Sequence, residues 1–228
     1  YKLEMKIITI SMKNSLGQER RGRLNYDYRW FKASNYDKVL PYIKERTTHY
    51  WNTGEKGRRG KEGTNDSYYR LVKHIITKKL SNIIITEDDC FLKEEEYALF
   101  LKNLPTELCY LNGRMAQIPR PWKPYHDFDK TMGTHEIDYN TFKIIGTWGI
   151  YIPHYSMLEP LWDRLSNPKR NKLRGIDVMI INDKLIKHYF YPSVFLCDEY
   201  DKSHVRTSKG QYWDNYTKIS NKNRKINI

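Results

Sequence analysis

Three consecutive carboxylates, Glu87, Asp88 and Asp89, are the side chains in this sequence best suited to chemistry. They directly follow Ile83–Thr86, a β-branched run that predicts a strand buried on both faces of an α/β sheet. Ligands of such sheets bind just beyond the carboxyl ends of the strands. Because adjacent carboxylates repel one another and their oxygens suit Mg²⁺ or Mn²⁺, the motif indicates a divalent-cation site. An acidic turn before a helix that begins at Glu94 is the plainer interpretation.

A first strand is expected earlier in the chain, over Met5–Met12, and it leads into a polar loop over Lys13–Arg23. A strand followed by a basic, glycine-containing loop favours binding of a nucleotide or phosphate. Ser11 at the end of this strand, and Arg20 and Arg21 in the loop, are therefore candidate contacts for a phosphate-bearing donor. An ordinary connection between elements explains the same pattern equally well.

A second basic segment, Gly54–Gly63, is rich in glycine and is expected to form a loop. It lacks the Gly-Lys-Ser/Thr order of a phosphate-binding P-loop. Its Arg58 and Lys61 are nevertheless candidates for closing on a pyrophosphate, with a surface turn as the alternative. A helix is expected to begin after this loop, near Asp66 or Ser67, since both residue types cap helices well.

The order of strand, loop, helix and strand over Met5–Leu92 is typical of nucleotide-binding α/β folds. We expect residues 1–228 to form one α/β domain with a mixed, mainly parallel central sheet flanked by helices. The elements expected after the acids are a helix over Glu94–Leu104, a strand over Glu107–Leu111, a substrate-facing aromatic loop over Arg114–Asn140, a strand over Phe142–Ile152, helices over Pro153–Asn167 and Ile176–Ile186, and a strand over Tyr189–Tyr191.

The composition supports a folded protein with a substantial core, because 39% of the 228 residues are hydrophobic and 14% are aromatic. The net charge of +13 is compatible with an anionic partner such as nucleic acid, a sugar nucleotide or a membrane surface. The basic residues are, however, spread along a chain that is rich in Lys, Asn and Ile throughout. We therefore attribute most of the charge to composition and expect no stable nucleic-acid partner.

The cysteines and the hydropathy pattern bear on location. Cys90, Cys109 and Cys197 are far apart and odd in number, which fits neither a disulfide framework nor a zinc spacing. They favour a reducing compartment, so a soluble cytoplasmic protein is expected. No stretch approaches the roughly 18 apolar residues of a membrane span, and no transmembrane segment is expected.

In order, these segments resemble GT-A glycosyltransferases, in particular glycosyltransferase family 25, the lipooligosaccharide and collagen galactosyltransferases, and related enzymes of large algal viruses. The strand ending in Glu-Asp-Asp, Ile83–Leu92, matches the family closely, as does the Gly-Thr-Trp-Gly motif within Gly146–Tyr151. Ile7–Arg20 and Gly175–Asp177 match in outline. Gly60–Ser67 matches loosely, because the Ser-His pair of the family is Ser-Tyr here.

The resemblance implies an enzyme of glycan biosynthesis that moves a hexose or deoxyhexose from a nucleoside-diphosphate sugar, with UDP-sugar favoured, to a glycan or glycoprotein. It implies a Mn²⁺ or Mg²⁺ cofactor bound directly by Asp89. Asp88 is expected to contact the donor sugar or ribose, or to reach the metal through water, and Glu87 adds negative charge beside it. His204 is a candidate for a further metal ligand from near the C-terminus.

The acceptor side of the site is expected from later segments. The resemblance implies inversion by single displacement, which needs a base for the acceptor hydroxyl, and Asp177 is the candidate, with helix capping as its plainer role. Thr147, Trp148 and Gly149 are candidate acceptor contacts. The donor half is expected at about 1–113 and the acceptor half at about 114–200, followed by a polar tail over 201–228.

Two other functional classes remain open from sequence. A metal-dependent nuclease would also use a strand, acids and a basic surface, although its lysine should stand closer to the acids than Lys93 does. A non-catalytic nucleic-acid-binding module would use the many Lys, Arg and Tyr residues, but it leaves the acidic strand end unexplained, since acids repel phosphate unless a metal is bound.

Overall fold

The computed structural model describes residues 5–47, 54–118, 124–167 and 173–197, with side chains in the second range from Arg59 onward. The elements in these ranges are, in chain order, β1 (Lys6–Ser11), α1 (Ser15–Gly22), β2 (Arg29–Lys32), η1 (Tyr36–Lys38), α2 (Pro41–Arg46), α3 (Gly54–Thr77), β3 (Ile83–Glu87), β4 (Cys90–Leu92), α4 (Glu94–Lys102), β5 (Cys109–Tyr110), β6 (Arg114–Gln117), β7 (Gly133–Glu136), β8 (Phe142–Ile145), β9 (Ile150–Ile152), η2 (Tyr155–Leu158), α5 (Glu159–Ser166), α6 (Ile176–Asn182), β10 (His188–Tyr191) and β11 (Phe195–Cys197). None of the described helices is both long and apolar enough to cross a membrane.

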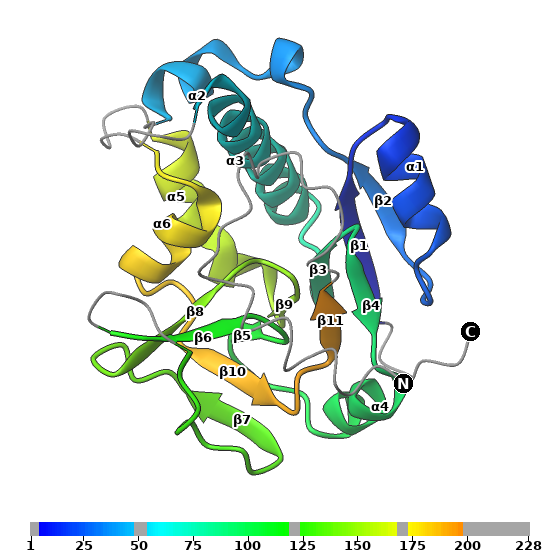
Figure 1. The fold of residues 1–228 in the computed structure, drawn as a ribbon, viewed down its shortest axis with the longest axis vertical. Coiled ribbons are helices and arrows are strands. Elements are labelled where there is room, and N and C mark those ends of the chain that lie inside the picture. Colours follow the sequence, from blue (N-terminus) through cyan, green and yellow to red (C-terminus); the bar gives the residue numbers. More distant parts are fainter. Residues whose placement is uncertain (1–4, 48–53, 119–123, 168–172, 198–228) are drawn as a thin grey trace.

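A mixed sheet of seven strands forms the centre of the described ranges, in the order β2-β1-β3-β9-β5-β10-β7 (Figure 1). β2, β1, β3, β5 and β10 run in one direction, whereas β9 and β7 run against them. Two short ribbons, β4 with β11 and β6 with β8, stand beside the main sheet. The predicted α/β class and mixed central sheet are confirmed.

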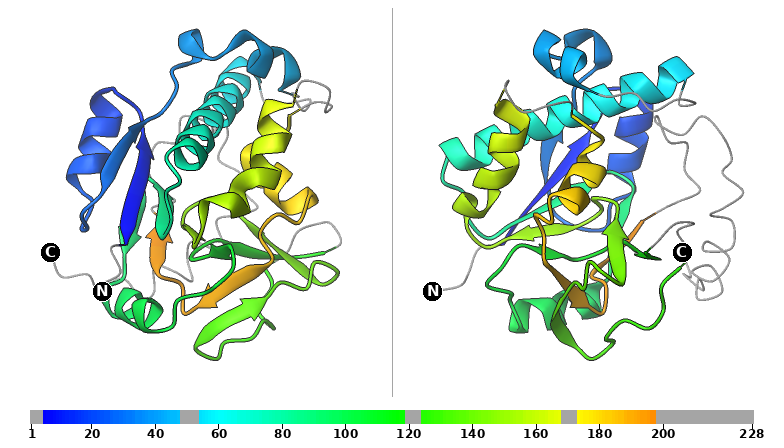
Figure 2. Two further views of the ribbon diagram at one scale, coloured as in Figure 1. Left: turned by 180° about the vertical axis from the view of Figure 1, so that it is seen from behind. Right: turned by 90° about the vertical axis from the view of Figure 1, so that its left-hand side faces the viewer.

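Helices cover the two faces of this sheet unequally. α3, α5 and α6 lie on one side and α4 on the other, as the turned views in Figure 2 show. Strand β3 is buried on both faces, because Ile83 and Ile85 share a core cluster with Leu71 of α3, while Ile84 packs in a second cluster with Phe100 of α4. Burying an isoleucine contributes roughly 1.5–3 kcal/mol, so β3 is a firm support for the acids that follow it.

Two basic segments that were expected to be loops are helical. Residues 13–23 contain α1, whose first turn is capped by the Asn14 side chain as it accepts a hydrogen bond from the Gly17 amide at 2.8 Å. Gly54–Gly63 is the first part of α3, which continues without a break to Thr77. The helix therefore does not begin at Asp66, which instead accepts a hydrogen bond from the Leu40 amide at 3.1 Å. The polar side chain serves a tertiary contact that sequence spacing does not reveal.

Two later expectations were also wrong. The segment Arg114–Asn140 is not one aromatic loop, because it contains β6 and β7. The strand expected over Phe142–Ile152 is two strands, β8 and β9, in different sheets. The chain breaks between them at Gly146, whose φ of +103° suits glycine far better than other residues. Strands β2 and β11 were not expected at all, because β2 is short and mixes basic with aromatic residues, and β11 has only three residues.

Candidate functional site

The acidic motif lies at the edge of the sheet where parallel β1, β2 and β3 end. β9 runs the opposite way, so the loop that precedes it reaches the same edge. This topology brings Thr147 to the end of β3, where its hydroxyl donates a hydrogen bond of 2.6 Å to Glu87 Oε1. The edge thus joins segments that are 60 or more residues apart in the chain.

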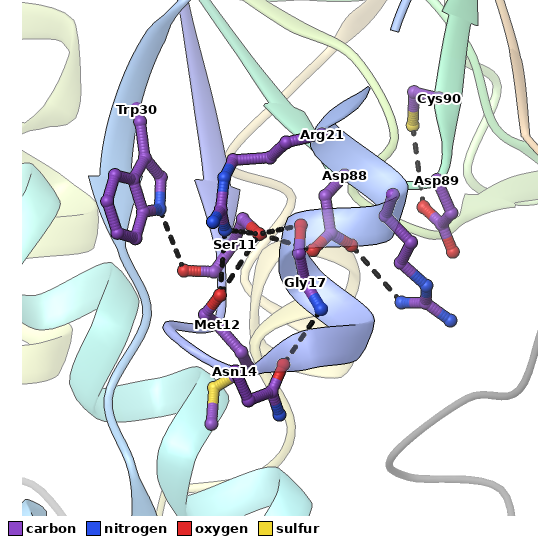
Figure 3. Close-up of polar contacts among 10 residues, drawn as sticks. Ser11, Met12, Asn14, Gly17, Arg21, Trp30, Asp88, Asp89 and Cys90 are labelled. Atoms are coloured by element: carbon purple, nitrogen blue, oxygen red, sulfur yellow. Dashed lines mark hydrogen bonds and ion pairs between the residues drawn. The ribbon is translucent and has the colours of Figure 1, made fainter. Parts of the chain in front are cut away.

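Asp88 is held by two groups from the first strand and helix (Figure 3). Ser11 Oγ, at the end of β1, donates to Asp88 Oδ2 at 2.6 Å, and Arg20 Nη1, on α1, donates to Asp88 Oδ1 at 3.1 Å. Arg21 Nη1 in turn donates to Ser11 Oγ at 2.6 Å. Both Asp88 oxygens are therefore engaged, and the buried Arg20–Asp88 pair fixes α1 to the acidic motif.

A cavity of about 460 Å³ opens beside these residues. Its volume falls within the range of roughly 300–1,000 Å³ that is usual for sites of small molecules and cofactors. The wall combines acids from the end of β3 with arginines, hydroxyls and an aromatic ring from α1, α3 and the segment after β2. Its lining residues are Ile10, Ser11, Met12, Arg20, Ala33, Ser34, Asn35, Tyr36, Arg59, Gly60, Gly63, Thr64, Ser67, Tyr68, Glu87, Asp88 and Asp89.

Glycines keep one wall of this cavity open. Gly60 and Gly63 stand one helical turn apart on α3 and both line the cavity. A Cβ on Gly63 would lie 3.1 Å from the Ser34 carbonyl oxygen, closer than an ordinary contact. Glycine weakens a helix interior by roughly 0.5–1 kcal/mol relative to alanine, and here it allows close approach of backbone segments around open space.

The acids carry raised pKa values. Burial, followed by the charge of Asp89, raises the pKa of Glu87 to about 8, even though the Thr147 hydrogen bond opposes this. Burial also raises the pKa of Asp89 to about 6, while the charge of Arg20 works against the rise. Two carboxylates that resist ionisation at one place fit a divalent cation, because its charge would favour the ionised forms.

The metal-ligand candidates therefore differ in availability. Asp89 lines the cavity and accepts a long contact of 3.8 Å from Cys90 Sγ, and hydrogen bonds from the Cys197 side chain and from the backbone lower its pKa. Asp88 also lines the cavity, but Ser11 and Arg20 already engage its two oxygens. Asp88 therefore has both oxygens in strong polar contacts, whereas Asp89 contacts thiols.

Asp177 stands in the first turn of α6. It is not among the described residues that line the cavity, yet its negative charge contributes to the raised pKa of Glu87. Burial raises the pKa of Asp177 itself, while a hydrogen bond from the Val178 amide and the charges of Lys61 and Lys143 oppose the rise. Its Oδ1 accepts the Val178 amide at 2.8 Å, so the carboxylate bonds within its own helix turn without capping it.

The three candidate acceptor contacts have other partners in this structure. Thr147 bonds to Glu87, and the Trp148 ring lies under the guanidinium of Arg114, whose Cζ is 4.9 Å from the ring centroid. A Cβ on Gly149 would meet the ring of Phe195 at 2.9 Å, so this position needs glycine for packing. Among the described lining residues of the cavity, none of the three is present.

Of the other predicted donor contacts, some line the cavity and some do not. Arg20 and Ser11 line the cavity. Arg21 acts behind them, since it donates to Ser11 and its Cζ lies 4.0 Å from the Trp30 ring centroid. Lys61 lies on α3 near Asp177, and burial lowers its pKa. His204 and the side chain of Arg58 lie outside the part of the chain that is described.

Several lining residues were missed from the sequence. Ser34, Asn35 and Tyr36 follow β2, and they would have been expected at this edge had β2 been recognised. Tyr68, on α3, was also missed as a cavity residue. Its side chain is 1% exposed and lines the cavity. Burial raises the pKa of Tyr68, the Thr147 side chain opposes this rise, and the Tyr68 hydroxyl makes no hydrogen bond of good geometry among the described residues.

Comparison with known proteins adds no relative. No family model matches the chain, and no curated protein matches it. Fold and site together define an α/β protein with a mixed seven-stranded sheet and a polar, partly acidic cavity at the edge where its parallel strands end.

Proposed function

We propose that the protein is a GT-A-type glycosyltransferase that moves a sugar from a nucleoside-diphosphate sugar to a glycan or glycoprotein acceptor, with inversion and with a divalent metal. The observation that supports it most is the pairing of opposite charges in one cavity. Three acids at and directly after the end of β3 and two arginines, Arg20 and Arg59, line the same cavity of about 460 Å³. A diphosphate with its cation needs both kinds of group, whereas an oligonucleotide backbone needs only the basic kind.

The arginines account for the diphosphate. Arg20 is held in place by Asp88, so its guanidinium is positioned before any ligand arrives. Arg59 on α3 lies over the Tyr36 ring, 4.6 Å from guanidinium carbon to ring centroid, at another side of the cavity. Guanidinium groups bind phosphate oxygens in a bidentate way, so two positioned arginines favour a ligand with adjacent phosphates.

The acids account for the metal. Mn²⁺ or Mg²⁺, when bound, supplies positive charge that stabilises the leaving nucleoside diphosphate. Asp89 would hold it, with the partly buried Glu87 carboxylate adding negative charge nearby. Asp88, fixed between Ser11 and Arg20, would orient the donor sugar or ribose.

Asp177 is the proposed general base. An acceptor hydroxyl must lose its proton as it attacks the anomeric carbon, and a base of raised pKa is suited to accept it at neutral pH. Burial raises the pKa of Asp177 in this way, and the positive charges of Lys61 and Lys143 oppose the rise. Its charge acts on Glu87, the acid to which Thr147 donates a hydrogen bond.

Nucleotide-sugar hydrolysis tests this proposal directly. The protein is incubated with a panel of nucleoside-diphosphate sugars and Mn²⁺, and release of nucleoside diphosphate is followed without any acceptor. We expect slow, metal-dependent release from one donor, abolished in Asp89→Asn. Release from no donor, or unchanged release in Asp89→Asn, would contradict the proposal, and metal-dependent cleavage of oligonucleotides would point to a nuclease instead.

A further inference from the structure

Two cysteines that are distant in sequence face one another beside the acidic motif. β4 begins immediately after Asp89 and pairs antiparallel with β11, and the register places Cys90 directly opposite Cys197. Residues opposite one another in an antiparallel pair have Cβ atoms about 4.5–5.5 Å apart. The cysteines are 107 positions apart (197 minus 90), so their spacing in the sequence conceals the pair.

The Asp89 carboxylate completes a compact group with the two thiols. One carboxylate oxygen of Asp89 and the sulfurs of Cys90 and Cys197 lie within 4.8 Å of one another. The Cys90 thiol points at Asp89 Oδ1, 3.8 Å away (Figure 3). Cys109 does not belong to this group. It lies on β5, where its thiol donates to the Tyr110 carbonyl oxygen at 3.5 Å.

The geometry is close to that of a tetrahedral metal site. Zinc–sulfur bonds of about 2.3 Å place two thiolates of one tetrahedron about 3.8 Å apart, so ligand atoms within 4.8 Å need to close by about 1 Å or less. Cys90 is fully buried, whereas Asp89 and Cys197 are half-buried and leave a side for an ion to enter. Thiolates select soft or borderline cations and do not suit Mg²⁺ or Mn²⁺.

We propose that Asp89, Cys90 and Cys197 form a binding site for a thiophilic divalent cation such as Zn²⁺ or Cd²⁺. Asp89 also lines the cavity, so the fourth position of the site opens toward bound water or ligand. Both ions would use the Asp89 carboxylate, so the thiophilic ion would compete there with a hard divalent cation. The site goes beyond the proposed glycosyl transfer, which uses neither thiol.

Cadmium binding to the reduced protein tests the site without any nucleotide or sugar. Cd²⁺ is titrated into the full chain with a phosphine reductant, and thiolate-to-cadmium absorption in the ultraviolet is recorded. We expect saturation at about one equivalent, and a loss of affinity of tenfold or more in Cys197→Ser and in Asp89→Asn. Cys197 is half-buried, so this variant remains informative even if replacing the fully buried Cys90 prevents folding.

Cys109→Ser is the matched control, since it removes a buried thiol outside the group. It should bind Cd²⁺ as the unaltered protein does. Absence of thiolate absorption in the unaltered protein, or absorption that is kept by Cys197→Ser and lost by Cys109→Ser, would overturn the proposal. Because the measurement involves no donor, a failed hydrolysis experiment leaves its outcome untouched, and the reverse also holds.

Discussion

Asp177 illustrates how a single buried carboxylate links stability to chemistry. Its pKa is raised in the fold above the ordinary value of 3.8, chiefly by burial. The folded protein therefore favours the protonated form, so ionising Asp177 costs stability as the pH rises above about 4. A buried acid that opposes folding at neutral pH is typical of a functional position, where stability is exchanged for reactivity.

We therefore predict that Asp177→Asn is more stable than the unaltered protein at pH 7, and that the difference disappears as the pH falls to about 4. Asparagine Oδ1 can still accept the Val178 amide hydrogen bond while the charge is removed. Thermal unfolding across this pH range measures the effect. The same variant should bind donor normally and fail to transfer sugar. This result would show that Asp177 acts as a base, because loss of a purely structural residue would not stop transfer while donor binding and stability are kept.

Asp138 provides the control of opposite sign. It is exposed, and hydrogen bonds from Thr141 and Asn140 hold its pKa below the ordinary value. Its contribution to stability is therefore present at neutral pH and is lost as the pH falls through its lowered pKa. Asp138→Asn should be slightly less stable than the unaltered protein at pH 7. If Asp177→Asn shows this same pattern, its burial is not what shifts its pKa.

The Tyr68 hydroxyl is a second buried polar group at the site. Its buried hydroxyl lines the cavity without a hydrogen-bond partner of acceptable geometry among the described residues. A buried hydroxyl left unpaired costs roughly 1–3 kcal/mol, so Tyr68→Phe should unfold at the same temperature or higher. If a ligand hydroxyl or phosphate normally bonds to this group, donor affinity should fall about tenfold, as calorimetry can measure.

Tyr110→Phe distinguishes a ligand contact from a general effect of burial. The Tyr110 hydroxyl is also buried without a partner of acceptable geometry in the described ranges, but Tyr110 is not among the cavity-lining residues. This variant should match Tyr68→Phe in thermal stability and keep full donor affinity. Equal losses of affinity in the two variants would mean that the cavity is not where the donor binds.

At the scale of elements, helix α3 forms one wall of the cavity with glycines at its surface. The free energy of placing leucine in a helix interior is roughly 0.5–1 kcal/mol more favourable than that of glycine, so Gly60→Leu should not weaken α3. Its side chain would, however, occupy the cavity that Gly60 lines. We predict a variant with an equal or higher unfolding temperature that no longer binds a nucleoside diphosphate in calorimetry.

Gly22→Leu is the corresponding control on α1. Gly22 also belongs to a helix, and a Cβ there meets no atom within 4 Å. The substitution should leave nucleotide binding unchanged. Should Gly60→Leu bind as tightly as this control, the wall of α3 does not face the bound nucleotide.

Elements differed sharply in how far the sequence could predict them. β3 was predictable because three consecutive isoleucines admit few environments other than a sheet buried on both faces. The helical state of Gly54–Gly63 was not, because glycine disfavours helices and the local pattern therefore indicated a loop. β11 was also missed, since only its pairing with β4 reveals it as a strand.

The same physical distinction applies to the candidate site. Ser11, Arg20 and the acids were predictable because each stands at the end of a recognisable strand or in the segment that follows it. Tyr36, Arg59 and Tyr68 reach the cavity only through the way α3 and the segment after β2 pack together. Contacts between distant segments, including the Cys90–Cys197 register, depend on the tertiary fold and leave no local pattern.

At the scale of the whole molecule, the net charge of +13 creates a field that attracts any polyanion. Such attraction is nonspecific and weakens strongly with salt. Specific binding of a nucleoside diphosphate should instead depend on the charges gathered at one cavity. The dependence of binding on salt and on metal therefore distinguishes nonspecific attraction by the net charge from specific binding in the cavity.

A ligand that binds only the folded state stabilises it by about 2.7 kcal/mol when its concentration is 100 times its dissociation constant. If Asp89 holds a cation that in turn binds the diphosphate, Mn²⁺ and UDP should each bind more tightly in the presence of the other. Their joint increase in unfolding temperature at 150 mM salt should then exceed the sum of the separate increases, as measured by thermal unfolding.

Asp89→Asn should reduce the joint increase to the sum of the separate ones, because the charge that holds the cation beside the diphosphate is gone. Asp163→Asn, an acid on α5 that is not among the described residues lining the cavity, should keep the full coupling. Strictly additive increases in the unaltered protein would place the two ligands at independent sites. A larger, metal-independent increase with an oligonucleotide at the same salt would show that the molecule recognises phosphate chains through its overall charge, and the acids at the end of β3 would then need another explanation.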